Sequence, residues 1–130
     1  MSKQDSHAEQ KIVESYINFY NTFQIDEMGD LFTEDCLFQN ISNASGSMEC
    51  RGKEEFLKLA TQSALLFKER KQIITNWVIG EHKIAIEIDY IATLAHDLPN
   101  GLKKGERLEL KGVCIYEFEA GKIKRLADFS

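Results

Sequence analysis

The second half of the chain contains four stretches with the residue alternation and β-branched composition of strands. The strands are expected at Gln72–Ile79, Lys83–Ala95, Arg107–Phe118 and Lys122–Phe129. The segments between them carry glycines and the only proline of the chain, which are turn residues. Two of the strands run to about twelve residues, which is longer than most strands. Because long antiparallel strands curl, we expect a curved sheet that encloses a cavity once helices cover it.

The first half of the chain instead shows helical periodicity. Apolar residues recur at intervals of three and four in Ser6–Phe23 and Lys53–Phe67, and a short helix is expected at Ile25–Phe32. A strand at Cys36–Ile41 and a loop at Ser42–Gly46 separate the second and third helices. This order indicates an α+β fold, a cone-shaped curved antiparallel sheet packed with the N-terminal helices, and not alternating β-α units.

Length and charge limit the domain count and the partners. The 130 residues predict one domain that spans residues 1–130. The net charge of −5 argues against a nucleic-acid partner, because phosphate binding needs a basic patch. The two basic clusters, 68–71 and Lys103–Lys104, are interpreted as solvated strand ends or turns. No apolar run approaches the roughly 20 residues of a membrane span, so no membrane partner is expected.

The cysteines and histidines do not form a pattern that binds a metal. Cys36, Cys50 and Cys114 are odd in number and lack the paired short spacings of a disulfide framework or a zinc site. Reduced thiols indicate a cytoplasmic location. None of the three histidines has a partner at ligand spacing, so no metal is expected.

Asp128 lies in an apolar sequence setting, between Leu126-Ala127 and Phe129. A three-residue turn at 119–121, with Gly121 as a left-handed bulge, pairs Phe118 with Lys122. Asp128 then shares a face with Cys114, whereas a two-residue turn would place it on the other face. Burial would raise the pKa of this carboxyl and suit it to proton transfer. The alternative is a solvated carboxylate or an ion pair with a neighbouring arginine.

A second acidic pair lies on the strand 84–90. Glu87 and Asp89 share one face of this strand, while its isoleucines and Tyr90 share the other. The pair is either catalytic or simply the solvated face of the sheet.

The large aromatic residues are candidates for core packing or for ligand contact. Buried tyrosines need a partner for the hydroxyl, so Tyr16 and Tyr20 are the better pocket candidates. Phe38, Trp77 and Tyr116 are assigned either to the core or to an apolar cavity wall.

Four short segments carry a resemblance that covers nearly the whole chain: Tyr16–Asn21, Leu31–Cys36, Gly52–Phe56 and Gly121–Ile123. In this order and spacing the chain resembles the SnoaL-like polyketide cyclase branch of the nuclear transport factor 2-like superfamily. Ketosteroid isomerases and limonene epoxide hydrolases are also members. The resemblance implies a cystatin-like α+β barrel with a ligand cavity, no cofactor, and the homodimers that are common in this superfamily.

Comparison with the isomerases gives a mixed result. Tyr16 matches the tyrosine that they use as an oxyanion donor. Asn40 stands where they have the aspartate that acts as general base, and Cys114 stands where they have a protonated aspartate. An amide cannot take a proton from carbon, so the resemblance argues against steroid-type isomerisation.

Comparison with the other two branches points to Asp128. Limonene epoxide hydrolases hold a water with a tyrosine, an asparagine and an aspartate, and here Phe38, Asn40 and Asp128 stand at those places. Glu87 replaces their arginine, while Asp89 matches their second aspartate. The SnoaL-type cyclases use an aspartate on the last strand as acid and base, which Asp128 matches, although their neighbouring histidine is replaced by a cysteine.

The leading hypothesis is therefore a SnoaL-like protein that holds a small apolar or oxygenated molecule in its cavity, as a cyclase or isomerase that uses general acid–base chemistry. Asp128 would exchange the proton, Asn40 and Tyr16 would form hydrogen bonds, and Asp89 would be a second carboxylate. The residues expected to contact the ligand are Tyr20, Phe38, Trp77, Cys114 and Tyr116. An epoxide hydrolase and a non-catalytic ligand-binding or interaction module remain the alternatives, and the last is favoured if Asp128 and Asp89 face solvent.

Overall fold

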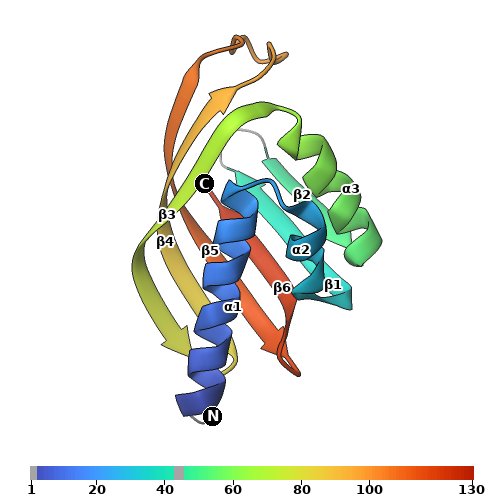
Figure 1. Ribbon diagram of the computed structural model, residues 1–130, viewed down its shortest axis with the longest axis vertical. Helices are drawn as coiled ribbons and strands as arrows, with labels where there is room; N and C mark the ends of the chain where they lie inside the picture. The colour runs from blue at the N-terminus through green and yellow to red at the C-terminus, as the bar shows by residue number, and fades with distance from the viewer. Residues whose placement is uncertain (1–2, 43–45) are drawn as a thin grey trace.

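The computed structural model describes residues 3–42 and 46–130 and consists of a strongly curved sheet with three helices against it (Figure 1). The six strands lie in the order β2-β1-β6-β5-β4-β3. Neighbouring strands are antiparallel except β1 and β6, which run parallel. The elements in chain order are α1 (Lys3–Asn21), α2 (Ile25–Asp30), β1 (Phe32–Ser42), β2 (Gly46–Arg51), α3 (Lys53–Ala64), β3 (Phe67–Gly80), β4 (Lys83–Leu94), β5 (Arg107–Glu119) and β6 (Lys122–Phe129).

The predicted α+β architecture is confirmed, with one additional strand. The strand β2 (Gly46–Arg51) pairs with β1 at the edge of the sheet. It was not predicted because Cys50 is its only buried residue, so its sequence shows no apolar alternation. The predicted loop falls partly on residues 43–45, which lie outside the described part of the chain, while Ser42 and Gly46 belong to strands.

The helices cover the concave side of the sheet. α1 packs against β3, and α3 packs against β1 and β2 (Figure 1). Val13, Tyr16 and Ile17 are the buried face of α1, at the three- and four-residue spacing of one helix side. Full burial of one such apolar side chain stabilises the fold by about 1.5–3 kcal/mol. No described helix is long and apolar enough to cross a membrane.

Side chains fill only part of the concave face. Ile84, Ile86 and Tyr116 are almost completely buried on this face of β4 and β5. Further along the same face of β5, Leu110 is 50% exposed. The helices therefore close one half of the concave face and leave the other half open.

Candidate functional site

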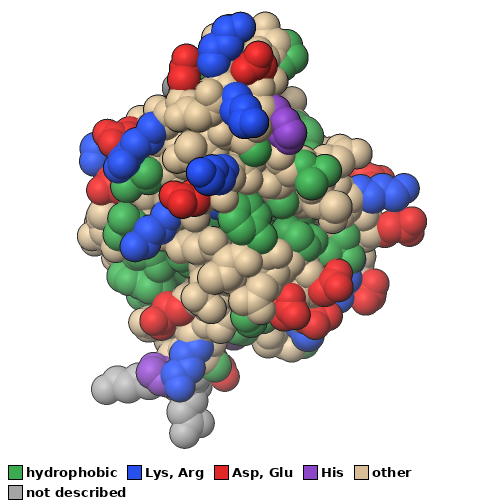
Figure 2. All heavy atoms as spheres, turned by 45° about the horizontal axis from the view of Figure 1, so that its top comes forward, with side chains coloured by type: hydrophobic (Ala, Val, Ile, Leu, Met, Phe, Trp, Pro, Cys, Tyr) green, Lys and Arg blue, Asp and Glu red, His purple; other side chains and the backbone are tan. Residues whose placement is uncertain are grey.

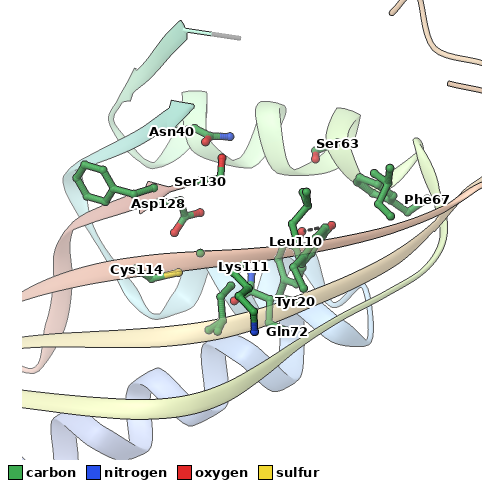
Figure 3. A pocket seen from close by; sticks show the side chains of 15 residues that line it. Tyr20, Asn40, Ser63, Phe67, Gln72, Leu110, Lys111, Cys114, Asp128 and Ser130 are labelled. Carbon is green, nitrogen blue, oxygen red and sulfur yellow. Dashed lines mark hydrogen bonds between the residues drawn. The ribbon is translucent and has the colours of Figure 1, made fainter. Parts of the chain in front are cut away.

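Asp128 lies in the middle of the concave face. Its neighbour on β5 is Cys114, directly opposite in the antiparallel pairing, and its neighbour on β1 is Asn40. Figure 3 shows the three side chains close together on three adjacent strands. A carboxyl, a thiol and an amide thus form one polar row across three adjacent strands.

The β5–β6 hairpin places Asp128 on the same face as Cys114, as predicted, but with a different turn and register from the predicted ones. Its turn has two residues, Ala120 and Gly121, both with positive φ (50° and 78°), so the predicted three-residue turn is wrong. Phe118 pairs with Ile123, and the register then shifts so that Lys124 is an extra residue on β6. This bulge restores the alternation, and Asp128 shares its face with Cys114 despite the shorter turn.

The surroundings of the Asp128 carboxyl favour its protonated form. Its Oδ1 atom is buried and has no hydrogen-bond partner among the described residues. Burial raises the pKa of Asp128 from 3.8 to about 6, although a hydrogen bond with the Cys114 thiol opposes the rise. A carboxyl with a pKa near 6 can both accept and return a proton close to neutral pH.

Two adjoining cavities of about 260 Å³ and 110 Å³ reach this carboxyl. Both are lined by Tyr20, Asn40, Ser63 and Asp128. The larger one extends along the open half of the concave face, past Leu108 and Leu110. The smaller one lies under α1, α2 and α3, where Met28, Phe56 and Leu59 give it apolar walls.

Two tyrosines of α1 supply hydroxyl groups to these cavities. Tyr16 lines the smaller cavity, and burial holds the pKa of its hydroxyl well above the ordinary value. Tyr20 lines both cavities, and its hydroxyl lies 2.8 Å from the hydroxyl of Tyr90. Burial also raises the pKa values of Tyr20 and Tyr90. All three hydroxyls therefore stay neutral and can donate hydrogen bonds.

The residues expected to contact a ligand divide into two groups. Phe38 and Cys114 line cavities, the smaller and the larger one respectively. Tyr116 is fully buried below the site, and Trp77 packs against the core from β3, so neither is among the described residues that line the two cavities.

Asp89 does not join Asp128. It lies on the convex face of β4, where its Oδ1 accepts a hydrogen bond from Nζ of Lys111 at 2.8 Å. Glu87 lies on the same convex face and accepts a hydrogen bond from Asn76. The solvated alternative for this acidic pair is therefore the one that the structure favours.

Several residues of the site were missed from the sequence. Ser63, Gln72 and Tyr90 line the larger cavity. Arg70 was assigned to a solvated basic cluster, but this is wrong, because it is 5% exposed and lines the smaller cavity. The predicted strand began at Gln72, whereas β3 begins at Phe67, so Arg70 was left outside the predicted strand.

The described residues contain no group of three His, Cys, Asp or Glu side chains close enough to hold a metal ion. The two cavities are lined by residues with a carboxyl, a thiol, two amides, two serine hydroxyls, three tyrosine hydroxyls, one lysine amine and one guanidinium.

Comparison with known families finds one match, the SnoaL-like domain, over residues 13–126. No curated protein matches the sequence significantly.

Solved structures with the same fold are numerous and distant in sequence. A phenazine biosynthesis-related protein from Pseudomonas aeruginosa superimposes with a TM-score of 0.78 at 20% identity, over 97% of this chain and 80% of that one. A candidate polyketide cyclase from Streptomyces antibioticus gives a TM-score of 0.77 at 12% identity, over 92% and 88% of the two chains. A protein with a ketosteroid isomerase-like fold from Catenulispora acidiphila, in complex with trimethylamine, gives 0.74 at 15% identity, over 92% and 84%.

Proposed function

The chain belongs to the SnoaL-like domain family, and from this premise we propose that it is an enzyme that moves a proton on a small oxygenated molecule held in its cavity. The observation that carries the proposal is the Asp128 carboxyl, which faces an open cavity and has a pKa of about 6. Perturbed acids in cavities are frequent at sites of acid–base catalysis.

The proposed reaction begins at a carbon next to a carbonyl group. The Asp128 carboxylate removes a proton from this carbon, and the electron pair moves onto the carbonyl oxygen to give an enolate. The Asn40 amide and the Tyr16 hydroxyl, which line the same small cavity as Asp128, donate hydrogen bonds to that oxygen. Protonated Asp128 then returns the proton to a different carbon of the delocalised enolate, which completes an isomerisation. Alternatively, the enolate carbon attacks a second carbonyl, and Asp128 returns its proton to the resulting alkoxide oxygen, which completes a ring closure.

Epoxide opening has less support. Asn40 and Asp128 are adjacent and could position a water, but that reaction also needs an acid to protonate the epoxide oxygen. Asp89, the matching second carboxyl, lies on the convex face in an ion pair with Lys111. A non-catalytic ligand-binding module uses the same cavity and is the outcome to be distinguished by experiment.

Proton–deuterium exchange tests the proposal without knowledge of the natural substrate. We expect the protein to accelerate deuterium incorporation next to the carbonyl of cyclohexanone or 2-indanone in D₂O, followed by proton NMR. The Asp128→Asn variant should lose about 10²-fold or more of that acceleration, which is the usual contribution of a positioned acid–base group. The matched control Asp89→Asn should retain it. Equal acceleration by wild type and Asp128→Asn would favour the non-catalytic module.

The convex face supports a proposal of homodimerisation. Ile73, Val78 and Val113 on this face are 38%, 60% and 39% exposed. Exposed apolar side chains on the open face of a sheet are typical of a surface that pairs with another protein. We therefore propose a homodimer through this face, to be checked by light scattering coupled to size-exclusion chromatography; a monomer at all concentrations would contradict it. The three free cysteines support a reducing, cytoplasmic location.

A further inference from the structure

Arg70 on β3 is a buried cation without a neutralising partner. It is 5% exposed, and no acidic side chain of the described residues forms an ion pair with it. It lines the smaller cavity together with Asp128, although the two do not pair with each other. Buried guanidinium groups in proteins are normally paired, so an unpaired one in a cavity wall needs an explanation.

One edge of the Arg70 guanidinium is already in use. Its Nε donates a hydrogen bond to the carbonyl oxygen of Tyr20 at 2.9 Å. This carbonyl is in the last turn of α1, where backbone oxygens have no partner within the helix. The Cζ atom lies 3.7 Å from the ring centre of Tyr20 and 4.5 Å from that of Phe23. These contacts fix the plane of the guanidinium in the wall of the cavity.

The far end of the guanidinium has unused hydrogen-bond capacity. Its Nη2 atom is buried and has no hydrogen-bond partner among the described residues. A role confined to the end of α1 requires only the Nε–H group and does not account for the two N–H donors of Nη2. The unused donors belong to a residue that lines the small cavity, beside the apolar walls formed by Met28, Phe56 and Leu59.

We propose that Arg70 binds the carboxylate of a small organic acid whose apolar body fills this cavity. The planar fork of a guanidinium matches the two oxygens of a carboxylate and is selective for that shape. Asp128 lines the same cavity, so it meets the other part of the bound molecule. The inference deepens the proposed function, on which the role of Asp128 rests, by naming the substrate class: oxo acids with an apolar body, and not neutral apolar molecules.

Benzoate and benzamide are suitable probes, because they have the same shape and differ in charge. We expect the wild-type protein to bind benzoate at least tenfold more tightly than benzamide in an NMR titration. Saturation with benzoate should also shift the Nε–Hε resonance of Arg70, which requires no substitution. Equal affinities, or an Arg70 resonance that does not move while benzoate binds elsewhere, would overturn the proposal.

Two variants at position 70 separate charge from shape. Arg70→Lys keeps the charge and the aliphatic stem but lacks the fork, and Arg70→Gln keeps a donor for the Tyr20 carbonyl but lacks the charge. The preference for benzoate should fall to near one in Arg70→Gln and to an intermediate value in Arg70→Lys. If both variants keep the full preference, the carboxylate binds somewhere else and the proposal is wrong.

The Asp128→Asn variant distinguishes this inference from the proposed function. It should bind benzoate at least as tightly as wild type, because a negative group has been removed from the same cavity. Benzoate binding that depends on Arg70, with no deuterium exchange on any ketone, would remove the enzymatic role and leave the binding site intact. Deuterium exchange that depends on Asp128, with no preference for benzoate over benzamide, would support the enzymatic role and overturn the carboxylate site at Arg70.

Discussion

Two aspartates on opposite faces of the same sheet have opposite surroundings: Asp89 is partly exposed and paired, whereas Asp128 has a buried carboxyl oxygen. Asp89 on the convex face of β4 has a side chain that is 41% exposed and holds Lys111 at 2.8 Å. Asp128 on the concave face of β6 has one oxygen buried without a hydrogen-bond partner among the described residues. The residue type is identical, so the difference comes from the surroundings that each face of the sheet provides.

The two faces differ in how well they stabilise the charged form of a carboxyl. On the convex face, the Asp89 carboxylate is in contact with water and is paired with Lys111. On the concave face, the same charge is taken out of water with only a thiol as its partner. The charged form of Asp128 is thereby made less stable, and the carboxyl becomes a proton acceptor of useful strength.

The largest expected difference between the faces is in packing. Leu126 is completely buried on the concave face, and Val78 is 60% exposed on the convex one. We expect Leu126→Ala to lower the free energy of unfolding by about 2–5 kcal/mol, because it removes buried methyl groups and leaves a void. Val78→Ala should have a much smaller effect. Urea unfolding followed by circular dichroism measures both.

The stability effect of Val78→Ala should depend on protein concentration. If the convex face pairs in a homodimer, the effect of Val78→Ala should grow with concentration, since subunit association stabilises the folded state. If Val78→Ala lowers the free energy of unfolding as much as Leu126→Ala at every concentration, the convex face is packed as tightly as the concave one, which would contradict this prediction.

The second expected difference concerns the two carboxyls directly. The pKa of Asp128 rises from 3.8 in the unfolded chain to about 6 in the folded one, so the folded state binds more protons between these values. Stability should therefore fall as the pH rises from 4 to 6, and the full penalty is present at pH 7. Asp128→Asn should raise the free energy of unfolding at pH 7 by up to about 2 kcal/mol, and the gain should vanish near pH 4.

The control is on the other face. Asp89→Asn removes the partner of Lys111 and should cause a small loss of stability at pH 7, opposite in sign to the gain at Asp128. The carbon-detected NMR titration of Asp128 itself should have a midpoint near 6. A midpoint near 4, or a pH-independent effect of Asp128→Asn, would contradict the raised pKa of Asp128.

The sequence predicts the two faces well where alternation is uninterrupted. On β4, Ile84, Ile86, Ile88 and Tyr90 point to one side and Glu87 and Asp89 to the other, as the period of two requires. The strand β2 could not be found in this way, because an edge strand that buries one residue carries no periodic signal.

The site is less predictable because it depends on bulges. The face of Asp128 depends on Lys124, an extra residue on β6 that nothing in the sequence of the hairpin marks. On β3, a similar shift between Ile74 and Asn76 changes which side chains face inward. Extending the alternation from Trp77 back to Arg70 therefore gives the wrong face for Arg70, and its charged neighbours reinforce the error.

A third acid, Glu9 on α1, is buried and has a histidine as its hydrogen-bond partner. The smallest of the expected effects concerns the pKa of this histidine. Glu9 is 5% exposed, like the groups of the concave face, but its Oε2 lies 2.8 Å from Nδ1 of His82 in the β3–β4 turn. The hydrogen bond to Glu9 is the main cause that raises the pKa of His82. A raised pKa in a histidine stabilises the fold below its unfolded value of 6.5, and this stabilisation is lost as the pH rises through the folded value.

The expected result is a pKa for His82 above 6.5 in a proton NMR titration, and a clear decrease in Glu9→Gln. Asp5→Asn is the matched control, because Asp5 acts on His82 through weaker, longer-range attraction and should lower this pKa less. If Glu9→Gln leaves the titration of His82 unchanged, the hydrogen bond to Glu9 is not the main cause of the raised pKa of His82. If the decrease is found, the pairing of a buried acid with a histidine is visible in the pKa of that histidine. Asp128 has no cationic partner among the described residues, and the effect of its burial is visible in its own raised pKa.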